Sequence, residues 1–442
     1  FGKDFLFRQN AHQLLFWGRV PAVALSLALA FLVLRWATAL WGEAAGLLAL
    51  FLYAFDPTIT AHAQLVTTDV GLAFFSTLYL WFLRAYLRQP STRNLLLSGL
   101  TLGLALGAKF SAVVLIPVSL TLMGAAVIWR PLSEGQTSNV RGELAKRWLV
   151  RHAVAFMGMM LLAVAVLWAL YLFPKDPSLF WKGIQLVNQD RGLDPYFYLM
   201  GELRPRGWNF YFVIAWLVKT PIPTLLLSGA GLVMLLRGRR AHWLDEAFLF
   251  VPAVSYFIFY SVFADNIGVR YLIPCFPFLF ISAGRLVPVV ERASLLSKLL
   301  LGAMLAWSLS EYLTIMPDHL SYFNQVAGGA SGGMEWLDHS NLDWGQGLIQ
   351  LQKFIQENQI EDYAYFYFGT ADPEYYGIHG RRITDFEFLL RPTRGLVILS
   401  AHFIPRGRDV LDRVFGRGPL NWLRHQKPIH VVGHSLYVYE IR

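Results

Sequence analysis

Long runs of Leu, Ala, Val and Phe recur along this chain from Pro21 to Met316, and they limit its fold more than any other feature. Many of the runs approach the roughly 20 residues that an α-helix needs to cross a lipid bilayer. Of the 442 residues, 55% are hydrophobic and 15% are charged, whereas soluble domains usually carry about 25% charged residues. A soluble fold of this length could not bury so much apolar surface. The runs therefore predict an α-helical polytopic membrane protein.

The composition of the chain changes where the apolar runs end. From Pro317 onward the sequence is mixed and charged, with frequent Gly, Pro and Asn. We therefore predict a transmembrane domain over residues 1–316 and a small second domain over residues 317–442. Hydropathy predicts about ten spans in the first domain, of which the second and fourth are short enough to be re-entrant or tilted. The expected spans are Pro21–Leu40, Ala44–Phe55, Val70–Leu87, Leu95–Gly107, Phe110–Trp129, His152–Phe173, Phe210–Leu236, Ala247–Phe263, Arg270–Leu286 and Leu299–Met316.

The segment after Pro317, which we call the tail, has the pattern of a small α/β domain. Its apolar residues recur with a helical period in one stretch and form short strand-like runs in others. Strands separated by helical stretches favour an α/β fold. The expected elements are a helix over Gln346–Glu357, strands over Tyr363–Phe368 and Leu396–Ser400, and a terminal hairpin of Ile429–Val432 and Ser435–Tyr439 around Gly433.

The basic residues indicate how the chain crosses the membrane. The formal charge is +9, but Lys and Arg occur in short blocks between the apolar runs, for example Arg84, Arg88 and Arg93 in one expected loop. Such blocks are typical of cytoplasmic loops and not of a nucleic-acid groove, so we predict no nucleic-acid partner. The connection Asp56–Asp69 contains no Lys or Arg. It is therefore expected on the outer face of the cell membrane, and ten spans return the tail to that same extracytoplasmic side.

Two acidic residues lie at the outer ends of expected spans. Ionisable groups at membrane depth are costly, so each is a candidate for function. Asp69 opens the predicted helix Val70–Leu87, where an N-cap role explains it equally well. Asp56 precedes Pro57 and is explained more simply as a helix cap with proline in the first turn.

Three cations interrupt or flank the apolar runs: Lys109, Lys219 and Arg270. Single cations at the ends of spans usually anchor a helix in the interface. Their convergence with an acid on one face would instead indicate a site for an anion. Lys219 is harder than Arg270 to explain as a surface group, because it falls within a long apolar run.

Sequence motifs for other chemistries are absent or weak. There is no Walker loop, no dinucleotide fingerprint after a strand and no His-Glu-x-x-His. His62, between the two acids, could join them in a metal site, but a lone His seldom does, so we predict no protein metal centre and leave a divalent cation as a possibility. The spacing of the glycines in Gly99–Gly107 predicts close helix packing. The single Cys275 excludes an intramolecular disulfide.

The order of several motifs resembles the bacterial glycosyltransferase family 39, which includes the protein O-mannosyltransferases and is similar to the aminoarabinose transferases of lipid A. The strongest likeness lies in Asp56-Pro-Thr-Ile-Thr-Ala-His-Ala-Gln-Leu-Val-Thr-Thr-Asp69 and in Gly99-Leu-Thr-Leu-Gly-Leu-Ala-Leu-Gly-Ala-Lys109-Phe-Ser. It continues through Tyr198-Leu-Met-Gly-Glu202, Gly207-Trp-Asn-Phe-Tyr, Lys219-Thr-Pro-Ile-Pro, Arg270-Tyr-Leu-Ile-Pro, Tyr322-Phe-Asn, Ser340-Asn-Leu-Asp-Trp-Gly-Gln346 and Tyr367-Phe-Gly-Thr-Ala-Asp-Pro.

The resemblance implies a membrane glycosyltransferase of the C-type fold with a polyprenyl-phosphate sugar as its donor. The sugar would pass to a hydroxyl of a protein, lipid or glycan on the outer face, with inversion at C1, and no separate cofactor is firmly predicted. A carboxylate would act as general base, and cations would stabilise the departing lipid phosphate. The residues implied are Asp69 and Asp56 as catalytic acids, Lys109, Lys219 and Arg270 at the carrier phosphate, and His62 and Glu202 as further substrate-binding candidates.

One departure from the family pattern concerns the beginning of the chain. Members of the family place their principal catalytic acid in a first outer loop, after an N-terminal span. Here Phe1-Gly-Lys-Asp-Phe-Leu-Phe resembles the end of that loop, so the first span and its acidic motif are expected to be missing from this sequence.

Two other classes of protein fit parts of the pattern. A transporter or flippase for lipid-linked sugars would also carry charges near the membrane, but such proteins often have related halves, and we find no internal repeat. A non-catalytic membrane scaffold with a partner-binding tail is the third interpretation. The grouping of candidate charges on one face favours the enzyme.

Overall fold

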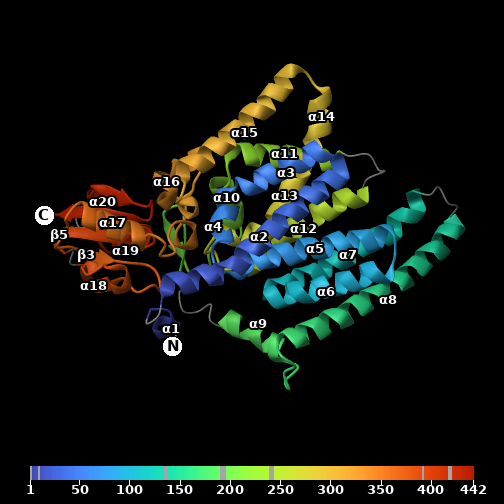
Figure 1. The fold of residues 1–442 in the computed structure, drawn as a ribbon, viewed down its shortest axis with the longest axis horizontal. Helices are drawn as coiled ribbons and strands as arrows, with labels where there is room; N and C mark the ends of the chain where they lie inside the picture. Colours follow the sequence, from blue (N-terminus) through green and yellow to red (C-terminus); the bar gives the residue numbers. More distant parts are fainter. Residues whose placement is uncertain are drawn as a thin grey trace.

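The computed structural model describes residues 2–7, 10–133, 138–189, 196–237, 243–390, 393–416 and 421–442. A bundle of long helices forms one end of the molecule and the tail forms the other, with α15 (Leu295–Ile315) running along the bundle toward the tail (Figure 1). The predicted fold class, a helical membrane protein with a small C-terminal α/β part, is confirmed. We keep the domain boundary at Pro317 as a proposal.

Six helical segments in the described part of the chain are long and apolar enough to cross a membrane, or up to eight if each of two bent helix pairs counts as one span. The predicted spans Leu95–Gly107 and Leu299–Met316 fall on α6 (Thr92–Ala108) and α15, which are not among these candidates. The number of about ten spans therefore stays a prediction. The six segments are Ala11–Trp41 (α2), Thr68–Arg88 (α5), Phe110–Val127 (in η1, Phe110–Val114, and α7, Leu115–Ser133), Ala145–Leu170 (in α8, Ser138–Leu170), Trp243–Phe263 (α12) and Val269–Arg292 (from η4, Val269–Cys275, to α14, Val287–Arg292).

Two of the predicted spans are broken. The span predicted over Phe210–Leu236 is wrong as a continuous helix, because α10 (Tyr211–Lys219) and α11 (Ile222–Leu236) meet at 120°. The short predicted span Ala44–Phe55 becomes α3 (Glu43–Ala54), which is followed by α4 (Pro57–Ala63) at 65°. Both breaks coincide with proline, which lacks an N–H and disfavours helical conformation in the residue before it.

Two arginines assigned to a loop from the sequence lie within the helix α5. Arg84 and Arg88, expected in a loop, belong to the last turns of α5. There Arg84 Nε lies 2.6 Å from Asp245 Oδ1 of α12, and Arg88 pairs with the same carboxylate. The ion pair between Arg84 and Asp245 offsets the cost of burying both of these charges inside the bundle.

The glycines of α6 form the predicted close contact, and their partner is α8 (Ser138–Leu170). A Cβ added at Gly103 would lie 2.7 Å from the Cβ of Val166 and 2.8 Å from the carbonyl oxygen of Ala163. A Cβ at Gly107 would lie 2.4 Å from Leu170 Cδ1. Real side chains do not approach so closely, so the two helix backbones can meet only because these positions are glycine.

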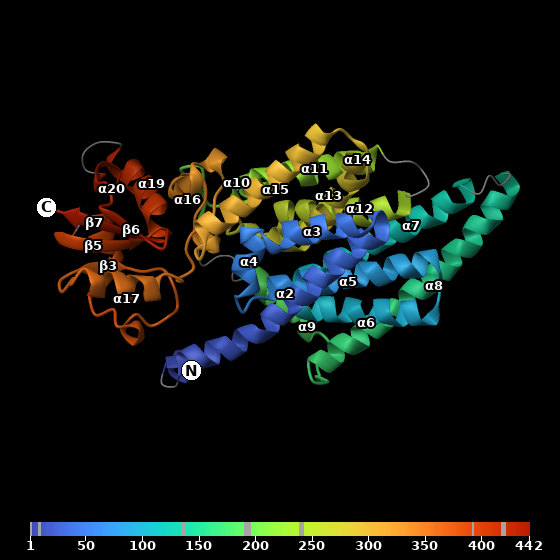
Figure 2. The same cartoon turned by 45° about the horizontal axis from the view of Figure 1, so that its top comes forward.

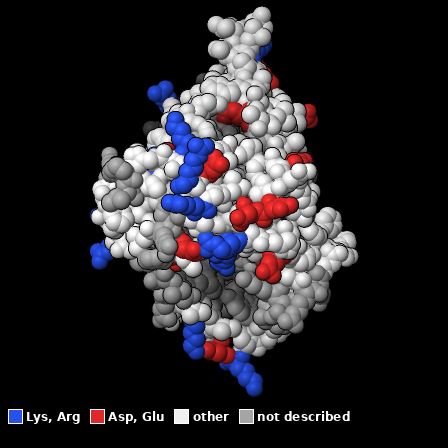
Figure 3. Space-filling view, turned by 90° about the vertical axis from the view of Figure 1, so that its left-hand side faces the viewer, with Lys and Arg blue, Asp and Glu red and all other residues white. Residues whose placement is uncertain are grey.

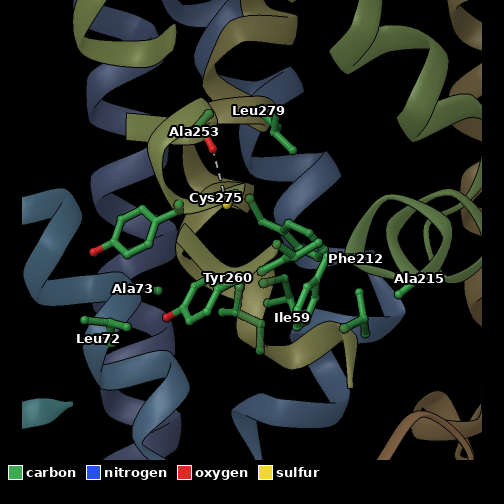
Figure 4. Packing of buried hydrophobic residues seen from close by; sticks show 14 of the residues in the cluster. Ile59, Leu72, Ala73, Phe212, Ala215, Ala253, Tyr260, Cys275 and Leu279 are labelled. Atoms are coloured by element: carbon green, nitrogen blue, oxygen red, sulfur yellow. Dashed lines mark hydrogen bonds between the residues drawn. The ribbon is translucent and has the colours of Figure 1, made fainter. Parts of the chain in front are cut away.

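The core of the bundle lies where short helices pack against long ones. Ile59 of α4, Leu72 of α5, Phe212 of α10 and Tyr260 of α12 belong to one buried cluster with Cys275, the last residue of η4 (Val269–Cys275) (Figure 4). The Cys275 thiol donates to the carbonyl oxygen of Ala253 at 3.6 Å. This packing fixes the ends of α4, α5 and η4, which carry the residues of the candidate site.

The tail contains a five-stranded mixed sheet in the order β4-β3-β5-β7-β6. Strand β3 is parallel to β4 and β5, whereas β5–β7 and β6–β7 are antiparallel. The helix α17 covers one face of the sheet and α19 covers the other (Figure 2). The predicted helix, strands and hairpin are confirmed, and α19 and β4 were not predicted. The strands are β3 (Ala364–Phe366), β4 (Arg381–Arg382), β5 (Gly395–Ser400), β6 (His430–Val432) and β7 (Leu436–Ile441), and the helices are α17 (Leu348–Glu357), α18 (Asp385–Leu389), α19 (Phe403–Phe415) and α20 (Trp422–His425).

The surface of the tail carries charges of both signs. On the face seen in Figure 3, basic and acidic side chains lie next to each other. Ion pairs of the tail include Arg408 with Glu335, at 2.6 Å, and Arg424 with Asp412. This interspersed pattern differs from the single-sign field expected of a surface that binds a polyanion.

Candidate active site

The acidic side chain of Asp69 meets two cationic side chains inside the bundle. Lys109 Nζ donates a hydrogen bond to Asp69 Oδ1 at 2.6 Å, and Arg270 Nη1 lies 3.6 Å from Asp69 Oδ2. The Asp69 side chain is 1% exposed, and those of Lys109 and Arg270 are 19% and 16% exposed. These three residues, which we call the Asp69 cluster, bring two positive charges and one negative charge together in a buried place.

Each member of the Asp69 cluster comes from the end of a helix. Asp69 lies in the first turn of α5, Lys109 is the residue that ends α6, and Arg270 lies in the first turn of η4. Both α6 and η4 pack against α5. The interpretation of Asp69 as a helix cap is wrong, because Thr67 occupies the N-cap position and the Asp69 carboxylate turns to Lys109 instead.

Aromatic rings surround the Asp69 cluster. Lys109 Nζ lies 4.4 Å from the centre of the Tyr271 ring. The guanidinium carbon of Arg270 lies 4.4 Å from the centre of the Trp344 ring, which comes from the tail. His62 of α4 meets the same Trp344 ring nearly edge-on, with 6.2 Å between ring centres. The cations are therefore held partly by π faces, which leave their hydrogen-bond donors available for other partners.

Several polar atoms around the Asp69 cluster are buried but have no hydrogen-bond partner among the described residues. They are Asp69 Oδ2, Arg270 Nε and His62 Nδ1. Buried polar groups are nearly always hydrogen-bonded, and an unsatisfied group calls for an explanation such as a bound molecule. Because the cations outnumber the carboxylate, the arrangement is suited to an anionic ligand that brings its own oxygen atoms.

Asp56 has the structural role that its sequence context suggested. Its carboxylate accepts a hydrogen bond from the backbone N–H of Ile59 at 2.9 Å, and Pro57 begins α4. This arrangement confirms the interpretation of Asp56 as a helix cap. Its second oxygen, Oδ2, is buried without a hydrogen-bond partner in the described structure. Only one of the two carboxylate oxygens therefore takes part in the cap.

Lys219 differs from the other two predicted cations in its immediate partners. Its ammonium donates to the carbonyl oxygens of Leu320 at 2.8 Å and of Asn341 at 2.7 Å, and its Nζ lies 4.4 Å from the centre of the Phe323 ring. All three partners belong to the tail. Lys219 therefore ties α10 of the bundle to two loops of the tail, and its predicted contact with a carrier phosphate stays a prediction.

Glu202 lies in another part of the structure. It is at the start of β2 (Glu202–Arg204), which pairs with β1 (Phe197–Leu199) in a hairpin. Its exposed carboxylate lies 2.8 Å from Arg204 Nη2, and Arg413 of α19 donates to the carbonyl oxygen of Leu203 in the same hairpin. The structure thus brings His62 to the Asp69 cluster and places Glu202 beside α19 of the tail.

Metal ligands do not gather in the described residues: no group of three or more His, Cys, Asp and Glu side chains there could hold a metal ion. The predicted possibility of a divalent cation is therefore supported by no ligand set in this part of the chain, and it stays a prediction.

The loop that carries Trp344 contains a second buried acid. Asp343 accepts hydrogen bonds from the backbone N–H of Gly345 at 2.8 Å and from the hydroxyl of Ser400. Burial raises the pKa of the Asp343 carboxyl to about 7, and these hydrogen bonds lower it only in part. The Asp343 carboxylate does not cap α17, because Gly347 is the N-cap of that helix.

Sequence reasoning missed two residues that contact the candidate lysines. Tyr271 supplies the ring beside Lys109, and Asn341 receives the ammonium of Lys219 on its carbonyl oxygen. Both belong to the segments that carry the family resemblance, Arg270-Tyr-Leu-Ile-Pro and Ser340-Asn-Leu-Asp-Trp-Gly-Gln346. The family resemblance of those segments was the sequence signal that could have identified both residues.

A comparison with known families finds a match in the first third of the chain. The matching family is a class of membrane glycosyltransferases that take their sugar from a lipid carrier. The particular resemblance lies in residues 9–137, which match the family described as dolichyl-phosphate-mannose-protein mannosyltransferase. The matched segment includes Asp56, His62, Asp69 and Lys109. The resemblance and the enzyme class predicted from the sequence are thereby confirmed.

Similar solved structures are distant in sequence. ArnT from Cupriavidus metallidurans in the apo state has 15% identity and a TM-score of 0.40, over 95% of this chain and 83% of that chain. The same protein bound to undecaprenyl phosphate has 15% identity and a TM-score of 0.40, over 96% and 83%. The Archaeoglobus fulgidus oligosaccharyltransferase tethered with an acceptor peptide has 10% identity and a TM-score of 0.41, over 90% and 59%. No curated protein sequence gave a match.

Proposed function

We propose that this protein transfers a sugar from a polyprenyl-phosphate carrier to a hydroxyl acceptor at the extracytoplasmic face of the membrane. The observation that carries the proposal is the Asp69 cluster, in which two partly buried cations meet one buried carboxylate. Asp69 Oδ2 and Arg270 Nε have no hydrogen-bond partners there in the described structure. A phosphate oxygen can accept from Arg270 Nε and supply the missing negative charge.

Lys109 and Arg270 are the groups we assign to the phosphate of the donor. Bond breaking at the sugar C1 leaves negative charge on the lipid phosphate, and fixed cations in a water-poor site stabilise that charge more than water does. Both cations are already oriented, by the Asp69 carboxylate and by the rings of Tyr271 and Trp344. Little reorganisation is therefore needed when the charge develops.

Asp69 is the group we assign to the acceptor. Its carboxylate takes the proton of the acceptor hydroxyl as the oxygen forms a bond to C1 of the sugar and the bond from C1 to the phosphate oxygen breaks. Attack from the side opposite the leaving phosphate inverts C1. The phosphate binds at Lys109 and Arg270, so the bound donor competes for the cations that neutralise Asp69 and leaves its carboxylate freer to accept a proton.

The position of the Asp69 cluster at helix ends supports a lipid-linked donor. Asp69 and Arg270 belong to candidate spans, and Lys109 directly precedes another. A polyprenyl chain could remain in lipid while its phosphate reaches the cluster. The outer location follows from the distribution of Lys and Arg in the sequence and is part of the proposal. The sugar and the class of hydroxyl acceptor are left open.

The proposal is tested by two isosteric carboxylate variants in a transfer assay with a polyprenyl-phosphate sugar. Asp69→Asn removes the proposed base and should lower kcat by about 10²- to 10⁴-fold, while binding of the polyprenyl phosphate is retained or tightened because the cations lose their internal partner. Asp56→Asn is the matched control, since asparagine also caps a helix, and it should keep most of the activity.

Equal turnover in the Asp69→Asn and Asp56→Asn variants would contradict the assignment of Asp69. Movement of the lipid-linked sugar across vesicles without transfer to any acceptor would favour a transporter. Binding of the carrier with neither transfer nor transport would favour a scaffold.

A further inference from the structure

Trp344 is a residue of the tail that lies on the candidate site of the bundle. Its ring centre is 4.4 Å from the guanidinium carbon of Arg270 and 6.2 Å from the ring centre of His62. The tail is therefore more than a neighbouring domain, because it supplies one side of the environment of a cation that the proposed function assigns to the donor phosphate.

A tight turn holds Trp344 in this position. The backbone N–H of Trp344 donates to Gln346 Oε1 at 2.7 Å, and the N–H of Gly345 donates to Asp343 Oδ1 at 2.8 Å. The Tyr367 hydroxyl donates to the carbonyl oxygen of Gly345 at 2.9 Å. Gly345 has φ = 80°, and a Cβ there would lie 2.3 Å from the same hydroxyl. The turn thus has one conformation, which only glycine fits well.

The same loop is fastened to the segment that carries Arg270. The Ser340 hydroxyl donates to the carbonyl oxygen of Ile267 at 2.8 Å. The backbone N–H of Val269 donates to Asn341 Oδ1 at 2.9 Å, and Val269 directly precedes Arg270. Two side chains of the tail loop therefore fix the position of this loop relative to the backbone that carries Arg270.

The contact with Trp344 leaves N–H groups of the Arg270 guanidinium available for a ligand. A guanidinium group presents its face to an aromatic ring while its N–H groups donate in its own plane. The guanidinium carbon of Arg270 lies over the Trp344 ring at 4.4 Å from its centre, and Arg270 Nε is buried with no hydrogen-bond partner in the described residues. The edge that includes Nε can thus take a bidentate contact to an oxyanion, which is the geometry that phosphate favours.

We propose that Trp344 is a positioning residue of the donor site: it holds the guanidinium of Arg270 by stacking, with the edge of the group directed to the phosphate of the lipid-linked sugar. The proposal rests on the proposed function, because it takes Arg270 as a ligand of that phosphate. It gives the tail a part in donor binding.

The test is a double-mutant cycle on the binding of a short-chain polyprenyl phosphate to the detergent-purified chain. Trp344→Ala should weaken binding by about tenfold, and Trp344→Phe should restore most of the affinity because a ring remains. Arg270→Met should weaken binding more. In the Arg270→Met background, Trp344→Ala should cause no further loss, since the two residues act as one unit.

Trp422→Ala is the matched control, because Trp422 is also a partly buried tryptophan of the tail, where it packs on Phe388 and Tyr439. It should leave the affinity unchanged. The inference is overturned if Trp344→Ala weakens binding equally with and without Arg270, if Trp422→Ala weakens it as much, or if Trp344→Ala has no effect on a chain that does bind. Failure of the unaltered chain to bind polyprenyl phosphate would overturn the proposed function together with this inference.

Discussion

At the scale of the residue, the surroundings of a charge decide its role more than its type does. Lys109 and Lys219 both lie at the ends of helices inside the protein, yet one faces a carboxylate and the other faces two carbonyl oxygens. A lysine beside a carboxylate can exchange that partner for a phosphate. A lysine already bonded to backbone carbonyls acts as a link between segments, because its removal would leave those carbonyls unsatisfied.

The buried carboxyl of Asp343 predicts how stability depends on pH. Burial raises its pKa to about 7, whereas the carboxyl in the unfolded chain has its ordinary pKa near 4. Between these values the folded state binds the proton and the unfolded state has lost it, so stability falls as pH rises through this window and levels off above it. The expected loss is at most about 4 kcal/mol of unfolding free energy.

Thermal unfolding of the tail, followed between pH 4 and 8, measures this effect. Asp343→Asn should flatten the pH dependence, since the side chain no longer titrates. Asp362→Asn, at an exposed position of the tail, should leave the pH dependence of the unfolding temperature unchanged. If the unfolding temperature of the Asp343→Asn variant depends on pH as strongly as before, another group is responsible.

At the scale of the element, the ends of helices position the Asp69 cluster, and the packing of whole helices determines where those ends lie. Lys109 ends α6, so the place of its ammonium depends on how closely α6 approaches its neighbours α5 and α8. Glycines on α6 allow the close approach to α8. Packing remote from the site thus contributes to its geometry.

Gly103→Ala tests this dependence. Its added Cβ would lie 2.7 Å from Val166 Cβ and 2.8 Å from the carbonyl oxygen of Ala163, so the helices must separate. We expect a loss of about 1–3 kcal/mol of stability, measured as a lower unfolding temperature in detergent. The matched change Gly302→Ala, in α15, adds a Cβ with nothing within 4 Å and should be neutral or slightly stabilising. Equal effects at both glycines would contradict the close-packing account.

At the scale of the whole molecule, the tail and the bundle form one site. Lys219 of α10 binds the carbonyl oxygens of Leu320 and Asn341, and Trp344 of the same tail loop lies on Arg270. The N-terminal end of α2 also contacts the tail, where the backbone N–H of Ala11 donates to the Tyr375 hydroxyl at 3.1 Å. The junction is thus polar and specific, which supports a fixed arrangement of the two parts.

Lys219→Met should loosen this junction while the bundle stays folded. Two buried carbonyls would lose their donor, at a cost of about 2–4 kcal/mol, and the tail should become more sensitive to limited proteolysis. Lys182→Met is the matched control, because its ion pair with Asp176 is exposed and such pairs contribute little. If Lys219→Met instead weakens polyprenyl-phosphate binding and leaves the tail protected, Lys219 is a phosphate ligand after all.

The sequence by itself determined the membrane-spanning character of the chain, the α/β pattern of the tail and the candidate acids and cations. Each of these is local: a run of apolar residues, a period of two or 3.6, or a charge within an apolar stretch can be read without knowing the rest of the fold. The motif order also carried the family resemblance. The break between α10 and α11 was not predicted, although Pro221 and Pro223 mark its place.

Only the tertiary structure decided which of the candidate charges meet. Asp69 and Lys109 are 40 residues apart in the chain, and Trp344 reaches the bundle from the tail. The partners of a buried charge depend on packing between elements distant in sequence. The same residue type can therefore have different roles at different positions. Asp56, Asp69 and Lys219 took different roles because their neighbours in space differ, and no local pattern encodes those neighbours.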